Sequence, residues 1–320
     1  MVSEEMYVLG TKKSTIRTIF EFGQKRAAEV GAENVFDFSL GNPNVPAPDF
    51  IRDAAVNILM HGDPTEVHGY TIAPGKPAVR EVLAADLKRR FGMEVTGKNL
   101  FMTAGAAASV TITFKALTEP GDEFVTFAPF FPEYRVFVEA CGGKLVVVPA
   151  KTDDFQIDLT ALERVLTPQT KAVIVNSPNN PSGAVYRETT IRRLTDLLRA
   201  KEQEYGHPIF IVADEPYREI VYDGASVPCI PLFYDNTIVC YSYSKSFSLP
   251  GERIGYIVVP DSAADFARIY GAIAGAARVL THVNAPSLWQ LVVARCVGQT
   301  ADLSIYERNA ALLYDWLTAL

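Results

Sequence analysis

Lys245 is the residue of this sequence whose type and setting best suit covalent chemistry. It lies among small hydroxyl residues, and a Pro-Gly turn and Arg253 follow it. The apolar runs on either side, Thr237–Cys240 and Ile254–Val259, predict a loop between two core strands. Most lysines are solvated surface charges. An amine held in a water-poor pocket, however, can form a Schiff base with a carbonyl, and a nearby cation such as Arg253 would lower its pKa.

Asp214 ends the very apolar run Ile209–Ala213, and Tyr217 follows three positions later. A carboxylate at the end of a buried strand must find a partner or face a pocket. It is either the N-cap of a helix or a carboxylate that pairs with a cationic ring nitrogen, with Tyr217 as a hydroxyl donor beside it.

Three further segments place special residues after strand-like runs. Gly105, Ala106 and Ala107 open a helix-like segment, where exposed amides favour phosphate, although a packing turn would use the same residues. Phe131, between two prolines, is either a core residue or a flat wall for a planar ring. Asn180 lies in a cluster of turn residues and could equally present its amide to a ligand.

The combined set of side chains matches the needs of pyridoxal phosphate. Its members are an amine, a carboxylate, an aromatic wall, a phosphate cradle and ring-oxygen donors. The assigned partners are Lys245 for the aldehyde, Asp214 for the ring nitrogen, Asn180 and Tyr217 for the ring oxygen, and Arg253, Ser242 and the amides after Thr103 for the phosphate.

The elements that must position these residues follow a regular rhythm of strands and helices. The predicted strands are 100–103, 123–127, 144–148, 171–176, 209–213, 237–242 and 254–259, and the helices include 106–116, 161–165 and 189–204. The alternation predicts an α/β fold with a mostly parallel central sheet and helices on both faces, and ligands at the strand ends. Upstream, the pattern predicts a helix from Ser14 to Val30, a strand over 35–40 and a helix over 49–61.

Composition narrows the class of protein. The 320 residues are 48% hydrophobic with a net charge of −7, which argues against binding to nucleic acid or to anionic membranes. No apolar stretch approaches the ~18 residues of a membrane span, and no signal peptide is visible. The four cysteines and four histidines are scattered, so zinc spacing is absent and reduced thiols in the cytoplasm are expected.

The last residues, 291–320, are predicted to form a long helix. Ser304 and Glu307 fit a capping box, and an apolar stripe follows that needs something to pack on. We expect this helix to lead toward a C-terminal small domain beyond Leu320. A homodimer surface is the alternative.

From about Ser14 to its end the chain resembles the class I/II aminotransferases, the aspartate-aminotransferase-like branch of fold-type I pyridoxal phosphate enzymes. The motifs that carry the resemblance are Ser242-Tyr243-Ser244-Lys245 with Arg253 downstream, Asp214-Glu215-Pro216-Tyr217, and Asn180-Pro181-Ser182-Gly183. One feature departs from the family, because no motif after Arg253 supplies the arginine that clamps the substrate carboxylate.

The resemblance implies a role for each matching residue. Lys245 is the Schiff-base lysine and proton shuttle, Asp214 is the pyridinium partner, Asn180 and Tyr217 contact the ring oxygen, and Phe131 stacks on the ring. The phosphate is held by Gly105, Ala106, Ala107, Ser242, Ser244 and Arg253, and Tyr70 reaches the phosphate of a neighbouring subunit. Gly41 contacts the substrate carboxylate, and Asn180 also takes part in substrate binding. A homodimer with shared sites follows from the role of Tyr70.

The implied domains are an N-terminal arm with the start of a small α+β domain (1–45), a large cofactor-binding domain (46–290) and the C-terminal helix (291–320). The implied activity moves an amino group from an L-amino acid, aspartate-like or aromatic, to a 2-oxo acid such as 2-oxoglutarate. A pyridoxal phosphate C–S lyase of the same fold and a non-catalytic pyridoxal phosphate-binding regulator are the alternatives.

Overall fold

The computed structural model describes residues 1–11, 15–39, 41–43 and 45–319 of the chain. By its internal contacts the chain divides into two units, residues 1–44 and residues 45–320. The first unit contains helices α1 (Glu4–Thr11) and α2 (Thr15–Val30) and the short helix η1 (Ala32–Asn34). Helix α2 confirms the helix predicted to end at Val30, and its predicted first residue, Ser14, lies outside the described residues.

The predicted strand over 35–40 is wrong for its described part, residues 35–39, where the backbone is irregular and joins no sheet. Phe36 and Phe38 form the apolar half of the alternating pattern, and they are 82% and 85% exposed. An alternating pattern gives a strand only where a neighbouring strand takes up its hydrogen bonds and a core covers its apolar face. Leu40 lies outside the described residues.

The second unit is built on a seven-stranded sheet with the order β1-β7-β6-β5-β4-β2-β3. The strands are β1 (Leu100–Thr103), β2 (Glu123–Phe127), β3 (Lys144–Val148), β4 (Thr170–Asn176), β5 (Phe210–Asp214), β6 (Thr237–Ser242) and β7 (Gly255–Val258). Strands β2 to β6 pair in parallel, and β7 runs antiparallel to both β6 and β1. The mostly parallel α/β sheet is confirmed, and each predicted strand agrees with the observed one to within a single residue at each end.

The second unit also contains the following helices. They are α3 (Asp49–His61), α4 (Pro64–His68), α5 (Pro77–Phe91), η2 (Gly97–Asn99), α6 (Ala106–Leu117), α7 (Glu133–Ala140), α8 (Leu159–Val165), α9 (Glu188–Tyr205), η3 (Ile230–Leu232), α10 (Tyr243–Ser246), α11 (Phe266–Val279), α12 (Ser287–Arg295) and α13 (Ser304–Thr318). All the described helices fall short of the length and apolar character that crossing a lipid bilayer requires.

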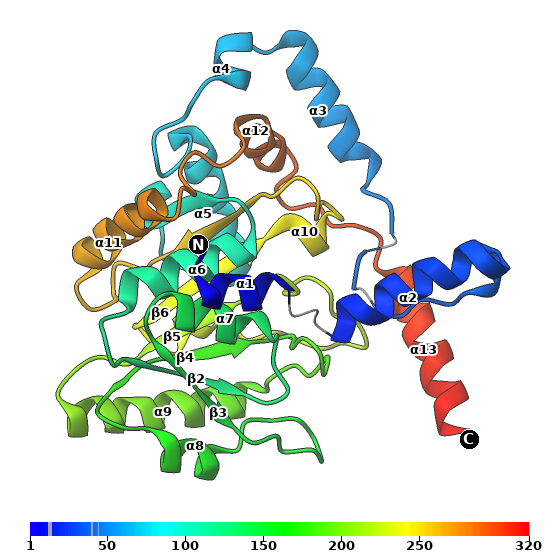
Figure 1. Ribbon diagram of the computed structural model, residues 1–320. Coiled ribbons are helices and arrows are strands. Elements are labelled where there is room, and N and C mark those ends of the chain that lie inside the picture. Colours follow the sequence, from blue (N-terminus) through cyan, green and yellow to red (C-terminus); the bar gives the residue numbers. More distant parts are fainter. Residues whose placement is uncertain (12–14, 40, 44, 320) are drawn as a thin grey trace. The chain divides into compact units, whose positions relative to one another are not determined.

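Two apolar cores cover the two faces of the sheet, because successive residues of a strand point to opposite sides. Val239 and Tyr241 of β6 belong to the core that includes α3, α5, α9 and α12. Ile238 and Cys240 belong to the core that includes α6, α7 and α11. These layers can be followed in Figure 1. Strands buried on both faces have apolar residues throughout, which explains why the sequence shows runs rather than strict alternation.

The sheet brings the predicted site residues to one edge. Strand β4 ends at Asn176, β5 at Asp214 and β6 at Ser242. Asn176 is the register partner of Asp214, which in turn is the partner of Cys240. Because these strands run parallel, the loops that follow them open on the same side.

The C-terminal part differs from the single helix predicted over 291–320. Helix α12 ends at Arg295, and Gly298, with a φ of +83°, turns the chain before α13 begins at Ser304. The capping box predicted at Ser304 is wrong: Leu303 occupies the N-cap position without a side-chain cap, and Asp302 accepts a hydrogen bond from the Ser304 amide at 2.9 Å instead.

Candidate active site

Asp214 lies at the end of β5 and is almost completely buried. Its Oδ2 accepts a hydrogen bond from the hydroxyl of Tyr134, on α7, at 2.5 Å. Its Oδ1 is also buried and accepts no hydrogen bond from the part of the chain that the structure describes. Burial raises the pKa of Asp214 to about 7, while the Tyr134 hydrogen bond acts in the opposite direction. A buried carboxylate oxygen without a donor calls for a cationic or proton-bearing partner.

Asn176 ties Asp214 to the turn that carries Asn180. Its side-chain amide donates to the Asp214 carbonyl at 2.8 Å, and its side-chain oxygen accepts from the Asn180 backbone amide at 2.7 Å. Burial and the nearby Asp214 raise the pKa of Tyr217, and a side-chain hydrogen bond with Asn180 opposes that rise. Asn180, Tyr217 and Asp214 therefore lie together at the ends of β4 and β5.

Lys245 lies on the single helical turn α10, directly after β6. Its Nζ is 5.9 Å from the centre of the Tyr217 ring, which places the amine beside the Asp214 group. Burial lowers the pKa of Lys245. Of the two causes expected from the sequence, removal from water is therefore confirmed, and the contribution expected of Arg253 is corrected, because burial accounts for the shift. A lowered pKa favours the neutral amine, the form that attacks carbonyls.

Gly105 and Arg253 meet at the first turn of α6. Gly105 has a φ of +88° and precedes the helix without a side-chain cap. A Cβ on Gly105 would lie 3.1 Å from the Arg253 guanidinium, so this guanidinium lies directly over the turn. Ala106 and Ala107 begin the helix, whose first amides have no intrahelical acceptors. A guanidinium beside free amides at a helix N-terminus is suited to a phosphate group.

The two serines near Lys245 and the aromatic wall complete the set. The Ser242 and Ser244 hydroxyls lie 2.7 Å apart, and Ser242 also accepts from the Ser244 amide at 3.1 Å. Phe131 is half-buried, and its ring meets the Tyr134 ring edge-on with centroids 5.6 Å apart. Phe131 thus lies next to the tyrosine that holds Asp214.

The match to family models decides what kind of protein this is. Residues 33–313 match the family described as aminotransferase class I and II. The chain belongs to that family.

Known proteins that are similar to this chain in sequence or in structure are also aminotransferases. The chain is 34% identical over 221 residues to a protein named as a probable aspartate/prephenate aminotransferase of Thermus aquaticus, which covers 69% of this chain and 55% of that protein. It is 32% identical over 255 residues to an aspartate aminotransferase of Pyrococcus horikoshii, covering 79% of this chain and 61% of the relative. It thus spans less than two thirds of these relatives. A solved amino transferase structure from Eubacterium rectale is 54% identical, with a TM-score of 0.98 over 100% of this chain and 80% of that one.

The roles predicted for the site residues of this aminotransferase-family chain stay predictions, including those of Gly41 and Tyr70. Gly41 belongs to the first unit and is exposed. Tyr70 follows α4, and its side chain is 95% exposed, which leaves it accessible to another subunit.

Sequence reasoning assigned no role to Tyr134 or Asn176, although both hold Asp214 in place. The available signals were weak. A buried tyrosine needs a hydrogen-bond partner, but its sequence position does not say which one. Asn176 was visible only as the polar end of an apolar strand.

Proposed function

We propose that the protein is a pyridoxal phosphate-dependent aminotransferase. It moves an amino group from an L-amino acid, aspartate-like or aromatic, to a 2-oxo acid such as 2-oxoglutarate. The observation that carries this proposal is the buried Oδ1 of Asp214, which accepts no hydrogen bond from the described residues, near a tyrosine ring that the Lys245 amine approaches to 5.9 Å. Membership of the aminotransferase family and relatives named as aspartate and aspartate/prephenate aminotransferases support the substrate class.

The residues present fit pyridoxal phosphate. The orphaned Asp214 Oδ1 would accept from the protonated ring nitrogen, which removes the unfavourable burial of an unpaired anion. The close approach of Arg253 to Gly105, with the free amides of Ala106 and Ala107, would hold the phosphate, together with Ser242 and Ser244. Phe131 would lie against the ring, and Asn180 and Tyr217 would bond its oxygen. Lys245 would hold the aldehyde covalently.

When bound, the cofactor supplies an electron-withdrawing ring that stabilises negative charge at the substrate Cα. The side chains of the protein supply the charge, the proton acceptor and the hydrogen-bond donor. Asp214 keeps its negative charge where it stabilises a proton on the ring nitrogen. The Lys245 Nζ would take the Cα proton, and its lowered pKa favours the neutral amine that this role requires. The Tyr217 hydroxyl, whose pKa is raised, stays protonated and donates a hydrogen bond.

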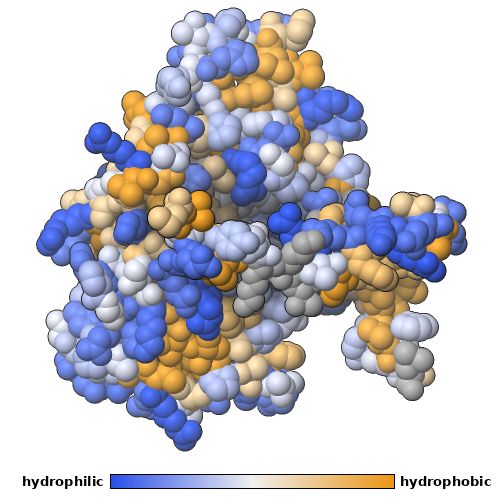
Figure 2. Space-filling view, viewed as in Figure 1, coloured by the Kyte–Doolittle hydropathy of each residue, from blue (hydrophilic) through white to orange (hydrophobic). Residues whose placement is uncertain are grey.

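A homodimer with shared sites is part of the proposal. Tyr70 and Ile72 are exposed, and α3 exposes Val56, Leu59 and Met60. Figure 2 shows apolar residues gathered over this helix, at the top of the view. An exposed apolar patch of this kind favours association with another protein surface. We propose that a second copy covers it and receives Tyr70, and that Gly41 contacts the substrate carboxylate.

A cytoplasmic location is also proposed. All four cysteines are free thiols, and Cys141, Cys240 and Cys296 are buried. Free thiols persist where the surroundings are reducing.

Replacing Lys245 tests the proposed activity. We expect Lys245→Ala to abolish the visible absorbance of covalently held pyridoxal phosphate and the turnover of amino acid with 2-oxoglutarate. Lys88→Ala, which removes an exposed lysine paired with Glu94, serves as the control and should keep both. Retention of the absorbance and turnover in Lys245→Ala would refute the proposal. Release of pyruvate and ammonia without a 2-oxo acid acceptor would instead identify a lyase.

A further inference from the structure

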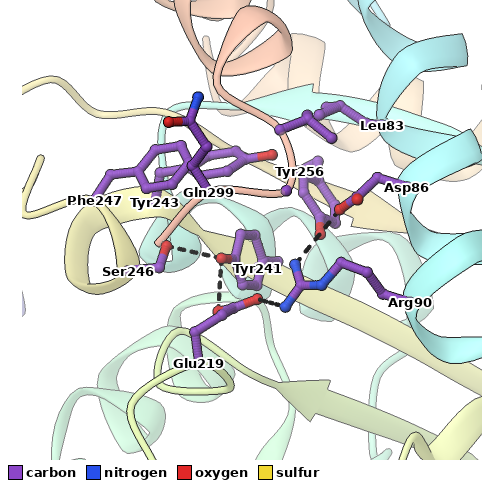
Figure 3. A pocket seen from close by; sticks show the side chains of 12 residues that line it. Leu83, Asp86, Arg90, Glu219, Tyr241, Tyr243, Ser246, Phe247, Tyr256 and Gln299 are labelled. Atoms are coloured by element: carbon purple, nitrogen blue, oxygen red, sulfur yellow. Dashed lines mark hydrogen bonds and ion pairs between the residues drawn. The ribbon is translucent and has the colours of Figure 1, made fainter. Parts of the chain in front are cut away.

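A chain of polar side chains lies beneath the turn that carries Lys245. It consists of Asp86 and Arg90 from α5, Glu219, Tyr241 from β6 and Ser246 from α10. Figure 3 shows their polar atoms directed toward one another. They border a cavity of about 20 Å³, which has room for roughly one water molecule and none for a substrate. These groups are therefore organised for one another rather than for a ligand.

The direction of the hydrogen bonds is fixed by proton count. The Tyr241 hydroxyl donates to Glu219 Oε2 at 2.8 Å, and a carboxylate only accepts. The same hydroxyl lies 2.8 Å from Ser246 Oγ, so Ser246 must be the donor to Tyr241. The second oxygen of Glu219 accepts from Arg90 at 3.1 Å. Burial and the nearby Glu219 hold the pKa of Tyr241 well above its usual range, which keeps this donor protonated.

The Tyr241 ring is held independently of its hydroxyl. It stacks on Tyr256 with centroids 4.9 Å apart and meets the Tyr243 ring edge-on at 5.1 Å. The Arg218 guanidinium lies 4.9 Å from its centre on a cation–π contact. Removal of the hydroxyl alone therefore leaves the packing of the ring in place, so the hydrogen bonds can be tested separately.

The turn α10 depends on such contacts because it is only four residues long. A single helical turn has little stability of its own. Ser244 ties the start of the turn to Ser242. Ser246 ties its end through the Tyr241 hydroxyl, and the Ser246 carbonyl accepts from the Ala301 amide at 3.2 Å. Lys245 lies between these two anchors.

We propose that the chain from Arg90 through Glu219 and Tyr241 to Ser246 positions the Lys245 amine. These residues act through the turn and not on the cofactor. Tyr241 belongs to the core on one face of the sheet, whereas Tyr134, which donates a hydrogen bond to Asp214, belongs to the core on the opposite face. This role for Lys245 rests on the proposed function. Loss of the Tyr241 hydroxyl removes one of the two ties at the end of the turn and moves the amine, but leaves Asp214 and the phosphate cradle as they are.

The test separates cofactor binding from reaction at the lysine. Pyridoxamine phosphate lacks the aldehyde, so its dissociation constant reports the ring and phosphate contacts alone. Pyridoxal phosphate reports Lys245 through the rate of covalent capture, followed by absorbance and confirmed by borohydride reduction and mass spectrometry. For Tyr241→Phe we expect an unchanged dissociation constant and capture that is about 10- to 100-fold slower, the size of effect that a misplaced reactive group produces.

Two further variants complete the design. Ser246→Ala breaks the same chain at its other end and should slow capture similarly, so the test stands even where one variant folds poorly. Tyr234→Phe is the matched control, because Tyr234 is also buried and its hydroxyl donates to the Ile209 carbonyl at 2.7 Å, in the same core but not to α10. It should capture pyridoxal phosphate at the wild-type rate.

The outcomes are distinct. Capture by Tyr241→Phe and Ser246→Ala at the wild-type rate overturns the positioning role. So does equal slowing in Tyr234→Phe, which would show general destabilisation, and so does a matching loss of pyridoxamine phosphate affinity. Failure of the wild-type protein to capture pyridoxal phosphate at Lys245 refutes the proposed function itself, and the positioning role with it.

Discussion

The burial of Asp214, whose Oδ1 accepts no hydrogen bond from the described residues, makes a quantitative prediction about the protein without cofactor. Burial raises the pKa of Asp214 from its ordinary value of 3.8 to about 7. Between these two pH values the folded chain binds a proton at Asp214 that the unfolded chain has released. The free energy of unfolding therefore falls as the pH rises through this window. A shift of about three pH units corresponds to roughly 4 kcal/mol, at about 1.4 kcal/mol for each unit.

Asp214→Asn replaces the titrating carboxyl with a neutral amide, so the contribution of this group to the pH dependence of stability is lost. Urea unfolding of the cofactor-free proteins at a series of pH values from about 5 to about 8 measures the effect. Over that range the wild type should lose roughly 3 kcal/mol more than the variant. Asp235→Asn, the same change at an exposed residue, should keep the wild-type slope. Pyridoxal phosphate should flatten the wild-type slope, because its ring nitrogen gives the ionised Asp214 a cationic partner.

Parallel pH dependence in the wild type and Asp214→Asn would contradict this reasoning. It would mean that Asp214 is ionised without penalty in the cofactor-free protein, so that its free oxygen would no longer point to a cationic ligand. A slope that pyridoxal phosphate fails to change would leave the buried carboxylate intact but would contradict its proposed partner.

Other substitutions give further expectations. Tyr134→Phe removes a hydrogen bond that lowers the pKa of the Asp214 carboxyl, so the upper limit of the pH window in which stability falls should move upward in the same unfolding series. Gly105→Ala should weaken the binding of pyridoxamine phosphate about 10-fold in a titration, because the added Cβ would press on the Arg253 guanidinium. Gly142→Ala is the control and should leave the binding unchanged, because Gly142 has a similar φ but open space around it. Arg218→Met should lower the free energy of unfolding by about 3–5 kcal/mol, measured in urea, because it leaves Glu215 buried without its cation, and adding Glu215→Gln should recover part of the loss.

Much of the fold is legible in the sequence because strands covered on both faces must be apolar throughout. The runs that became β1 to β7 were predicted nearly residue by residue, and the mostly parallel sheet followed from their alternation with helices. The error at 35–39 has the same origin. An alternating pattern describes the faces of a segment, but a strand also needs a neighbour, and the sequence does not say whether one is there.

The amino-acid sequence by itself indicated which side chains could do chemistry, because Asp214 ends β5, and Lys245 and Arg253 lie in the segment between β6 and β7, at the same edge of the sheet. The tertiary structure decided how that chemistry is tuned. Of the two causes expected to lower the pKa of Lys245, it kept burial and not Arg253. It also joined Tyr134 to Asp214 across 80 residues and Arg90 to Glu219 across 129. Periodicity tells which side chains are buried, but only the folded chain selects the partner that a buried polar group meets.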